Sequence, residues 1–316
     1  MIIDGHSHIG IDYYNGCATF NEYSDFCKRI GISKSIIMPM PWPCFCDDGL
    51  CCALLWEHDG KYNRNYYKID NNKGTKENVT ANPYERINNF IYNKYAFMHK
   101  NLDVYFAPLL HGVLDTPEQL EKQLIKNRVV AVKIHGFASG FTVEDMNPEL
   151  IEVLQYFQLP IIIHTSIYNY NYGYGYETKY WRNLDHPLRW ANFLIDNNLN
   201  GVLNHGACLN EETIKMVNKY DNLKIGIGPD LDINNDYFKV DIPKERYEKI
   251  SYLKELKKKV SADKLVFDID YNWNVNPNCK NIDCDAVNRI KSVWSEADQD
   301  KILSSNAKSF FTRIRE

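Results

Sequence analysis

Residues 2–8 of this chain read Ile-Ile-Asp-Gly-His-Ser-His, a short apolar run that leads into two histidines, and the prediction of the fold begins from this segment. The isoleucines predict the start of a strand. His6 and His8 are two positions apart, so on an extended segment both imidazoles project to one side. That arrangement suits a single metal ion. Because a lone pair of this kind is common by chance, its meaning depends on the rest of the chain.

Short β-branched runs alternate with longer helical stretches after this segment. Several of the runs are apolar without polar alternation, which is typical of parallel strands covered by helices. Eight such runs predict an α/β fold, a closed (β/α)8 TIM barrel, for which 316 residues leave room for insertions. The predicted strands are 2–4, 35–38, 104–108, 129–134, 160–163, 201–203, 223–227 and 264–267.

Two long insertions interrupt this pattern, at 39–86 after strand two and at 167–187 after strand five. Both follow strands, so both are expected on the active-site face of a barrel. Helices are expected to begin near Thr116-Pro117 and near Asn147-Pro148, because Thr or Asn followed by Pro is a typical helix start.

Ligand-type side chains follow three further predicted strands. His164 follows strand five, His205 follows strand six, and Asp270 follows strand eight. A closed barrel brings these strand ends to the rim that carries His6 and His8. Nitrogen ligands with one carboxylate and an open position are typical of a catalytic zinc site.

The combined segments resemble the amidohydrolase superfamily, in the branch that contains aminocarboxymuconate-semialdehyde decarboxylase. The matching segments are Asp4-Gly5-His6-Ser7-His8, Val132-Lys133-Ile134-His135, Ile162-Ile163-His164-Thr165, Asn204-His205-Gly206, Leu265 to Tyr271, and Lys301-Ile302-Leu303-Ser304-Ser305-Asn306-Ala307. They span nearly the whole chain in the order found in the family.

The resemblance implies that His6, His8, His164 and Asp270 hold a divalent metal, with His205 beside it. Zinc is the expected metal, with manganese or iron as alternatives. In relatives with one ion, the histidine at the place of His205 orients or protonates the reacting group, and in those with two it binds the second ion.

Three residues of this site keep alternative interpretations. Asp268 competes with Asp270 as ligand, although only the carboxylate nearer the rim can reach the metal. Lys133 stands where two-metal relatives carry a carboxylated lysine, but it could instead pair with Asp268 or with a substrate carboxylate. His135 shares the strand face of Lys133 and is expected either to contact substrate or to pack as a hydrogen-bonded side chain.

The insertions add aromatic and thiol groups to the expected mouth of the barrel. Tyr168 and its neighbouring tyrosines, with Arg182, suggest a pocket for a planar substrate with a carboxylate, or else a lid that packs on itself or on a second subunit. Six cysteines are also expected on the mouth side, four after strand two and two after strand eight: Cys44, Cys46, Cys51, Cys52, Cys279 and Cys284. They could bind a second metal or pair oxidatively, but isolated thiols are the expectation, since the spacing fits no zinc motif.

The four remaining histidines are given no chemistry. His186 precedes Pro187 and is expected to start a helix. His58, His99 and His111 are expected at surface or satisfied polar positions.

Composition excludes several classes of protein. The chain is 44% hydrophobic and 25% charged, with a formal net charge of -4 and no long basic run, so a nucleic-acid partner is not expected. Its apolar runs are too short for a membrane span. The first residues already resemble a strand, so we expect a cytoplasmic protein with reduced thiols. Residues 1–316 are expected to form one barrel domain, with a homodimer left open.

These observations predict a hydrolase that acts on an amide, ester, lactone or related bond of a small molecule. In this hypothesis the metal activates water, Asp270 accepts the proton, and the metal and His205 stabilise the oxyanion. The alternative is decarboxylation of an unsaturated or aromatic acid, with Arg182, Lys133 or Arg189 as the cation. A barrel that binds metal without catalysis is a third hypothesis, and the complete ligand set argues against it.

Overall fold

The structure is a computed structural model that describes most of the chain. The described residues are 1–11, 17–18, 20–40, 54–56, 65–70, 73–78, 81–97, 102–139, 141–165, 184–228, 249–271 and 285–315.

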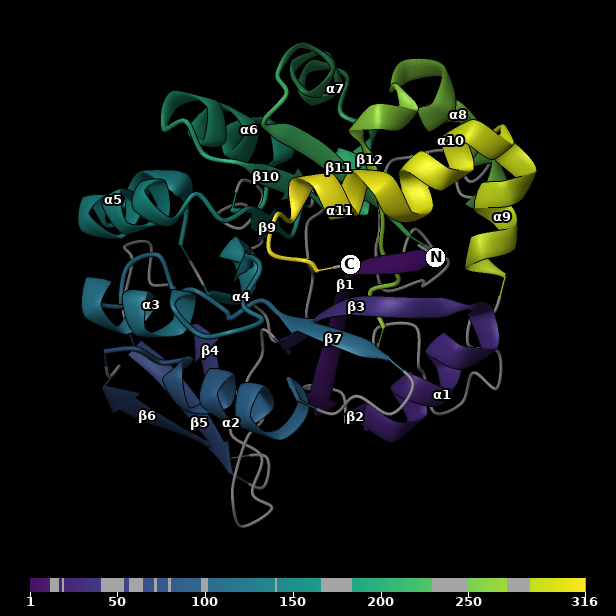
Figure 1. The fold of residues 1–316 in the computed structure, drawn as a ribbon. Helices are drawn as coiled ribbons and strands as arrows, with labels where there is room; N and C mark the ends of the chain where they lie inside the picture. Colours follow the sequence, from purple (N-terminus) through teal and green to yellow (C-terminus); the bar gives the residue numbers. More distant parts are fainter. Residues whose placement is uncertain are drawn as a thin grey trace.

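Eight parallel strands in two sheets form the centre of the molecule (Figure 1). The first sheet contains β1 (Ile2–Ile11), β3 (Ile32–Pro39) and β7 (Asp103–Phe106), with β2 (Cys17–Ala18) antiparallel at the edge of β1. The second contains β8 (Val132–Ile134), β9 (Ile161–Ile163), β10 (Gly201–Leu203), β11 (Leu223–Ile227) and β12 (Leu265–Phe267). All eight match predicted strands, although β1 is longer than expected.

Single contacts connect the two sheets, so the hydrogen-bonded barrel is not closed by continuous ladders. On one side, isolated parallel bridges pair Phe106 with Val129 and Leu109 with Lys133. On the other side, the Asp270 N–H donates to the His6 carbonyl at 2.8 Å, and the His8 N–H donates to the carbonyl after Asp270, at 3.2 Å. The second seam therefore lies at His6, His8 and Asp270, three of the predicted metal ligands.

Helices cover the outside of the strands, as the alternation of the sequence predicts (Figure 1). The main helices are α1 (Phe20–Ile30), α2 (Glu85–Tyr95), α3 (Pro117–Leu124), α5 (Pro148–Phe157), α6 (Pro187–Asp196), α7 (Glu211–Lys219), α8 (Lys249–Lys259) and α9 (Ala286–Val293). Shorter helices are α4 (Gly136–Ser139), α10 (Glu296–Asp300) and α11 (Asn306–Phe310).

Helix starts follow the expected capping chemistry. The Thr116 hydroxyl accepts the Gln119 N–H at 3.4 Å, and the Asn147 side chain accepts the Glu149 N–H at 3.0 Å. His186 also caps a helix, because its Nδ1 accepts the Leu188 N–H at 3.3 Å. Each cap is followed by a proline in the first turn, where a missing N–H costs nothing.

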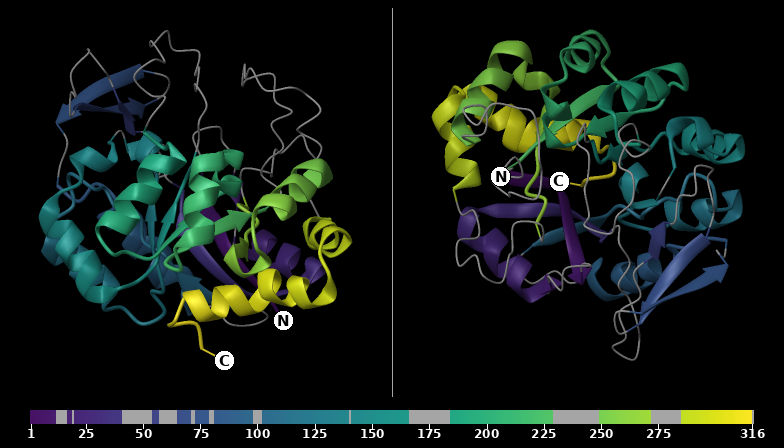
Figure 2. Two further views of the ribbon diagram at one scale, coloured as in Figure 1. Left: turned by 90° about the horizontal axis from the view of Figure 1, so that it is seen from above. Right: turned by 180° about the vertical axis from the view of Figure 1, so that it is seen from behind.

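The two expected insertions are described only in part. Between β3 and α2, the strands β4 (Leu54–Trp56), β5 (Asn65–Asp70) and β6 (Lys73–Asn78) form an antiparallel sheet of their own, at the edge of the molecule (Figures 1 and 2). The segment after β9 lies outside the described residues except for 184–187. The two insertions therefore stay predictions.

Two hydrophobic layers hold the barrel together. The larger lies between strands and helices, and the smaller fills the barrel interior. Ala307, Phe311 and Ile314 belong to the interior layer, with Ile3 and Val266 from the strands. The segment from α11 onward thus plugs the end of the barrel where both termini lie (Figure 2). Burying a ring such as that of Phe311 stabilises a fold by about 1.5–3 kcal/mol.

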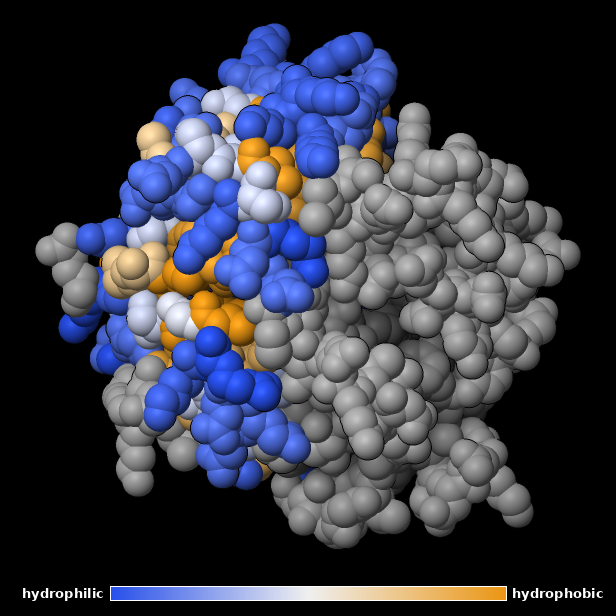
Figure 3. Space-filling model, turned by 90° about the vertical axis from the view of Figure 1, so that its right-hand side faces the viewer, coloured by the Kyte–Doolittle hydropathy of each residue, from blue (hydrophilic) through white to orange (hydrophobic). Residues whose placement is uncertain are grey.

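The surface on the side of α1 and α9 is mainly hydrophilic over its described part, with a smaller hydrophobic area within it (Figure 3). Among the described helices, none has the length and apolar character that crossing a membrane requires.

Candidate metal centre

His6, His8 and Asp270 meet at the seam between β1 and the end of β12. The Asp270 carboxylate lies 3.6 Å from His6 Nδ1 and 3.5 Å from His8 Nε2. All three residues are buried, and the three ligand atoms lie within 4.8 Å of one another. Contrary to the prediction that they follow strand one, both histidines lie within β1, which continues to Ile11.

The β3 strand fixes the tautomer of His8. His8 Nδ1 lies 2.7 Å from the Pro39 carbonyl oxygen, so Nδ1 carries the proton and donates it. In the neutral ring, Nε2 then presents a lone pair to the Asp270 carboxylate, which is also an acceptor. A proton or a metal ion between two buried acceptors at this distance removes their repulsion.

Asp4 anchors the backbone around these ligands. Its Oδ1 accepts the N–H groups of His6 and Ile269 at 3.1 and 3.0 Å. Its Oδ2 accepts the hydroxyls of Ser7, Tyr23 and Ser35. One carboxylate therefore ties β1 to β3, α1 and the segment after β12. Burial raises the pKa of Asp4, and these hydrogen bonds act in the opposite direction.

The side chains of Asp268 and Asp270 lie in different surroundings, and this difference bears on which of them could be the metal ligand. Asp270 has a positive φ of 46° and lies beside the two histidines of β1. Asp268 packs against the end of β11, where a Cβ at Gly226 or Gly228 would lie 2.3 or 2.4 Å from its carboxylate oxygens. Only glycine at these positions admits the Asp268 side chain.

A second group gathers His135, His164, His205 and Asp185. Asp185 Oδ2 lies 3.3 Å from His135 Nδ1 and 3.9 Å from His164 Nε2. The His135 and His164 rings stack with centroids 3.8 Å apart, and His205 Nε2 lies 2.8 Å from His164 Nδ1. The structure thus brings His164 to His205 and His135, while the His6 and His205 rings lie 6.1 Å apart and connect the two groups.

Asp185 is the residue that the sequence did not reveal. It precedes His186 and Pro187, a helix start in which only the cap drew notice. The sequence feature that could have indicated Asp185 is its position directly before a helix that follows a barrel strand. Helix starts of this kind lie at the mouth of the barrel, so an acid there can reach the site.

Burial and charge keep the imidazoles of both groups neutral. Desolvation, followed by the positive charge of Lys133, lowers the pKa of His6 and of His8 well below the usual value. Desolvation likewise lowers the pKa of His164, and that of His205 to about 4. Neutral imidazoles are the form that binds metal, so these rings need lose no proton on binding.

Lys133 lies on β8 and is fully buried. Its charge lowers the pKa of all five histidines of the two groups, which places it electrostatically within the site. Arg189 lies elsewhere, paired with Glu144, and its guanidinium lowers the pKa of that carboxyl to about 2.

His205 begins a backbone segment of unusual conformation. Residues 205–209 all have φ between 48° and 60°, the left-handed region, although only one of them is glycine. Left-handed backbone costs about 1–2 kcal/mol per non-glycine residue. Such strain is typical of functional sites that the surrounding fold holds in place.

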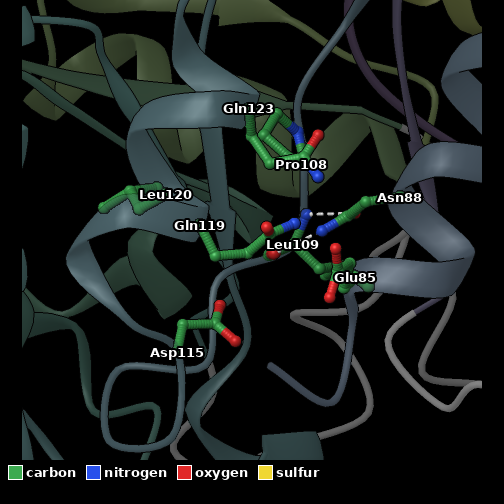
Figure 4. Close-up of a pocket in the computed structure, with 8 residues that line it drawn as sticks. All are labelled: Glu85, Asn88, Pro108, Leu109, Asp115, Gln119, Leu120 and Gln123. Atoms are coloured by element: carbon green, nitrogen blue, oxygen red, sulfur yellow. Dashed lines mark hydrogen bonds between the residues drawn. The ribbon is translucent and has the colours of Figure 1, made fainter. Parts of the chain in front are cut away.

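A small cavity lies away from both groups, between α2 and α3 (Figure 4). Its volume is about 10 Å³, close to the space that one water molecule needs. Asp115 lines it: Oδ2 accepts the His111 N–H at 2.8 Å, and Oδ1 has no hydrogen-bond partner among the described residues. His111 is buried and accepts two backbone N–H groups, the satisfied polar position that was expected.

Two predicted substrate-binding residues, Tyr168 and Arg182, lie outside the described residues. So do His58 and His99, which were given no role in the site, and the six cysteines Cys44, Cys46, Cys51, Cys52, Cys279 and Cys284.

Solved structures similar to this chain include enzymes of the amidohydrolase type. A 5-carboxyvanillate decarboxylase from Sphingomonas paucimobilis is 9% identical with a TM-score of 0.61, over 98% of each chain. A putative 2-pyrone-4,6-dicarboxylic acid hydrolase from Pseudomonas putida is 11% identical with a TM-score of 0.60, over 100% of this chain and 98% of the other. A zinc-bound amidohydrolase from Burkholderia multivorans is 8% identical with a TM-score of 0.56, over 99% of each.

No family model matches the chain, and no curated protein matches its sequence. The structural similarity covers nearly the full length of these chains, which confirms the α/β barrel and the amidohydrolase resemblance at the level of the fold. At such low identity the activity must be argued from the side chains themselves.

Proposed function

We propose that this chain, which has the barrel fold of amidohydrolases, is a metal-dependent hydrolase of an amide, ester, lactone or related bond in a small molecule. The observation that carries the proposal is the pair of facing acceptors, His8 Nε2 and the Asp270 carboxylate, 3.5 Å apart and buried. His6, His8 and Asp270 would hold the ion, with His164, whose ring lies next to that of His205, as a fourth ligand. We propose zinc, and we assign residues 1–316 to one domain.

The donor set fits a divalent cation. Neither ring nitrogen of His6 has a hydrogen-bond partner among the described residues, although the side chain is buried. An unsatisfied buried polar group costs about 1–3 kcal/mol, and a metal bond removes this cost at one nitrogen. Two imidazoles with a carboxylate are typical zinc ligands.

The side chains can perform the remaining steps of hydrolysis. A divalent ion supplies a Lewis acid, which lowers the pKa of water from about 15.7 towards 7. Asp270 accepts the proton of the attacking water, as a carboxylate within reach of that water can. Neutral His205 donates a hydrogen bond to the developing oxyanion, and Asp270 passes the proton that it took from water to the leaving group.

The test removes the two β1 ligands. The double variant His6→Ala/His8→Ala should lose zinc, measured by elemental analysis, together with turnover on a panel of lactones, esters and amides. Lys215→Ala is the control, because this exposed side chain on α7 lies outside the site. A double variant that keeps full turnover would contradict the proposal.

Decarboxylation of an aromatic or unsaturated acid is the second candidate. The buried amine of Lys133 favours it, because a cation inside the barrel can hold a substrate carboxylate. Carbon dioxide release from a panel of aromatic acids, with Lys133→Gln as the comparison, separates this activity from hydrolysis. Release by the unaltered protein, and its loss in the variant, would favour the decarboxylase.

A further inference from the structure

Asp185 is a buried acid that the steps of the proposed reaction do not use. Its side chain is 2% exposed, and it lies at the point where the chain returns from the loop after β9 to α6. The backbone here is anchored, because the buried indole of Trp190 donates to the Leu184 carbonyl at 2.9 Å and His186 caps the helix. The carboxylate is therefore held by a rigid element.

The Asp185 carboxylate also packs closely against Gly136, on the side opposite α6. A Cβ at Gly136 would lie 2.9 Å from Asp185 Oδ1 and 2.7 Å from the Leu184 carbonyl oxygen. Any larger residue after His135 would push the acid away. The sequence thus places a glycine directly after the histidine that the acid contacts.

We propose that Asp185 is a positioning residue, which fixes the tautomer of His135 and the orientation of the His135–His164 pair. Its Oδ2 lies 3.3 Å from His135 Nδ1, so the proton of the neutral ring is held on Nδ1. The fixed His135 ring stacks on His164 at an interplanar angle of 10°. His164 in turn keeps its 2.8 Å contact with His205. The proposal rests on the proposed function insofar as His164 and His205 act there.

A second metal ion held by His135, His164 and Asp185 is the competing interpretation, since their ligand atoms lie within 4.8 Å of one another. The ring geometry disfavours it, because nearly parallel stacked rings direct their lone pairs along parallel lines, whereas the ligands of one ion converge.

The decisive experiment reads the tautomer in metal-free protein labelled with 15N in its histidines. The His135 signals are assigned by their loss in His135→Gln. In the unaltered protein His135 should carry its proton on Nδ1, and in Asp185→Asn, whose amide can donate to Nδ1, the proton should move to Nε2. Asp196→Asn, an exposed acid on the same helix, is the control and should leave the tautomer unchanged.

Zinc titration provides the second measurement. Loss of a carboxylate that orients a ligand typically weakens metal affinity by about 10- to 100-fold, and we expect that range for Asp185→Asn with the number of ions per chain unchanged. Asp185→Glu, which restores a carboxylate, should recover part of the affinity. A lower number of ions in Asp185→Asn, or a wild-type His135 protonated on Nε2, would overturn the proposal. Since the tautomer is read without metal, failure of the proposed hydrolase would not affect that result.

Discussion

Asp4 connects the two ends of the chain through one carboxylate. Its bond to the Ile269 N–H spans 265 positions in sequence, and four further donors surround it. Asp4→Ala would leave these donors buried without their acceptor. We expect a loss of about 3–5 kcal/mol in unfolding free energy, the range for breaking a buried charged network.

Urea denaturation measures this loss. Asp25→Ala, an exposed acid on α1, is the control and should change stability by less than about 0.5 kcal/mol. If Asp4→Ala lowered the unfolding free energy no more than the control does, the carboxylate of Asp4 would not stabilise the fold as proposed.

Asp115 should make stability depend on pH. Burial raises its pKa from 3.8 to about 7, so between these values the folded protein keeps a proton that the unfolded chain has lost. The stability from this group is complete below pH 3.8 and is lost as pH rises through 7. Asp115→Asn cannot ionise, so its stability relative to wild type should rise by about 1.4 kcal/mol per pH unit across this window.

Urea unfolding at pH 5, 6, 7 and 8 measures the difference in unfolding free energy between Asp115→Asn and wild type. Asp25→Asn serves as the exposed control. A constant difference between Asp115→Asn and wild type at all four pH values would refute the raised pKa.

At the scale of elements, the left-handed segment 205–209 carries strain that a substitution can release. Cys208 has φ of 54° and is only half-buried, so glycine there loses little packing. Cys208→Gly should stabilise the protein by about 1 kcal/mol, because glycine adopts this conformation without a clash. Ser292→Gly, at an exposed position within α9, should instead destabilise the protein by about the same amount, because glycine is unfavourable inside a helix.

Thermal unfolding of the two glycine variants makes this comparison. A Cys208→Gly variant that is less stable than wild type would show that the segment is not strained.

Strand positions were predicted well because each parallel strand is a short apolar run between helices, as at Leu223–Ile227. Strand lengths were predicted less well, because the ends of a strand depend on its pairing with neighbouring strands. Val129 was expected to start a strand, but it forms only an isolated bridge, and β8 starts at Val132. The extension of β1 to Ile11 follows from its pairing with β3 and β2, which the sequence of β1 alone does not encode.

The candidate site was predicted to the extent that its residues follow strands. His6, His8 and Asp270 were found because strand order brings them together. Asp185 was not found, because it comes from a helix start, and its approach depends on the absent side chain of Gly136. The grouping of His164 with His135 also depends on side-chain packing that spacing does not reveal.

At the scale of the whole molecule, the metal-free protein should lose stability in mild acid. The pKa values of His6, His8, His135, His164 and His205 are lowered on folding, so below about pH 6.5 the unfolded chain binds protons that the folded protein does not. Each histidine can contribute a slope of about 1.4 kcal/mol per pH unit. Their number outweighs the opposite effects of Asp4 and Asp115.

Urea unfolding in chelator from pH 8 to pH 5 measures this loss, and added zinc should raise stability at pH 8 more than at pH 5. His205→Gln should reduce the slope between pH 4 and pH 6. A metal-free protein that is equally stable at pH 5 and pH 8 would contradict the buried, neutral histidines.

The seam at Asp270 and the plug at Phe311 also bear on the biosynthesis of the protein. One edge of β1 pairs with β3 soon after both are synthesised, but its other edge meets residues 269–271 only when they have emerged from the ribosome, and the interior stays open until Phe311 arrives. Neither the ligand group nor the barrel interior can therefore form before these later segments are synthesised. Until then β1 has one edge without a strand partner, and we expect chaperones that bind exposed strand edges to hold the nascent chain.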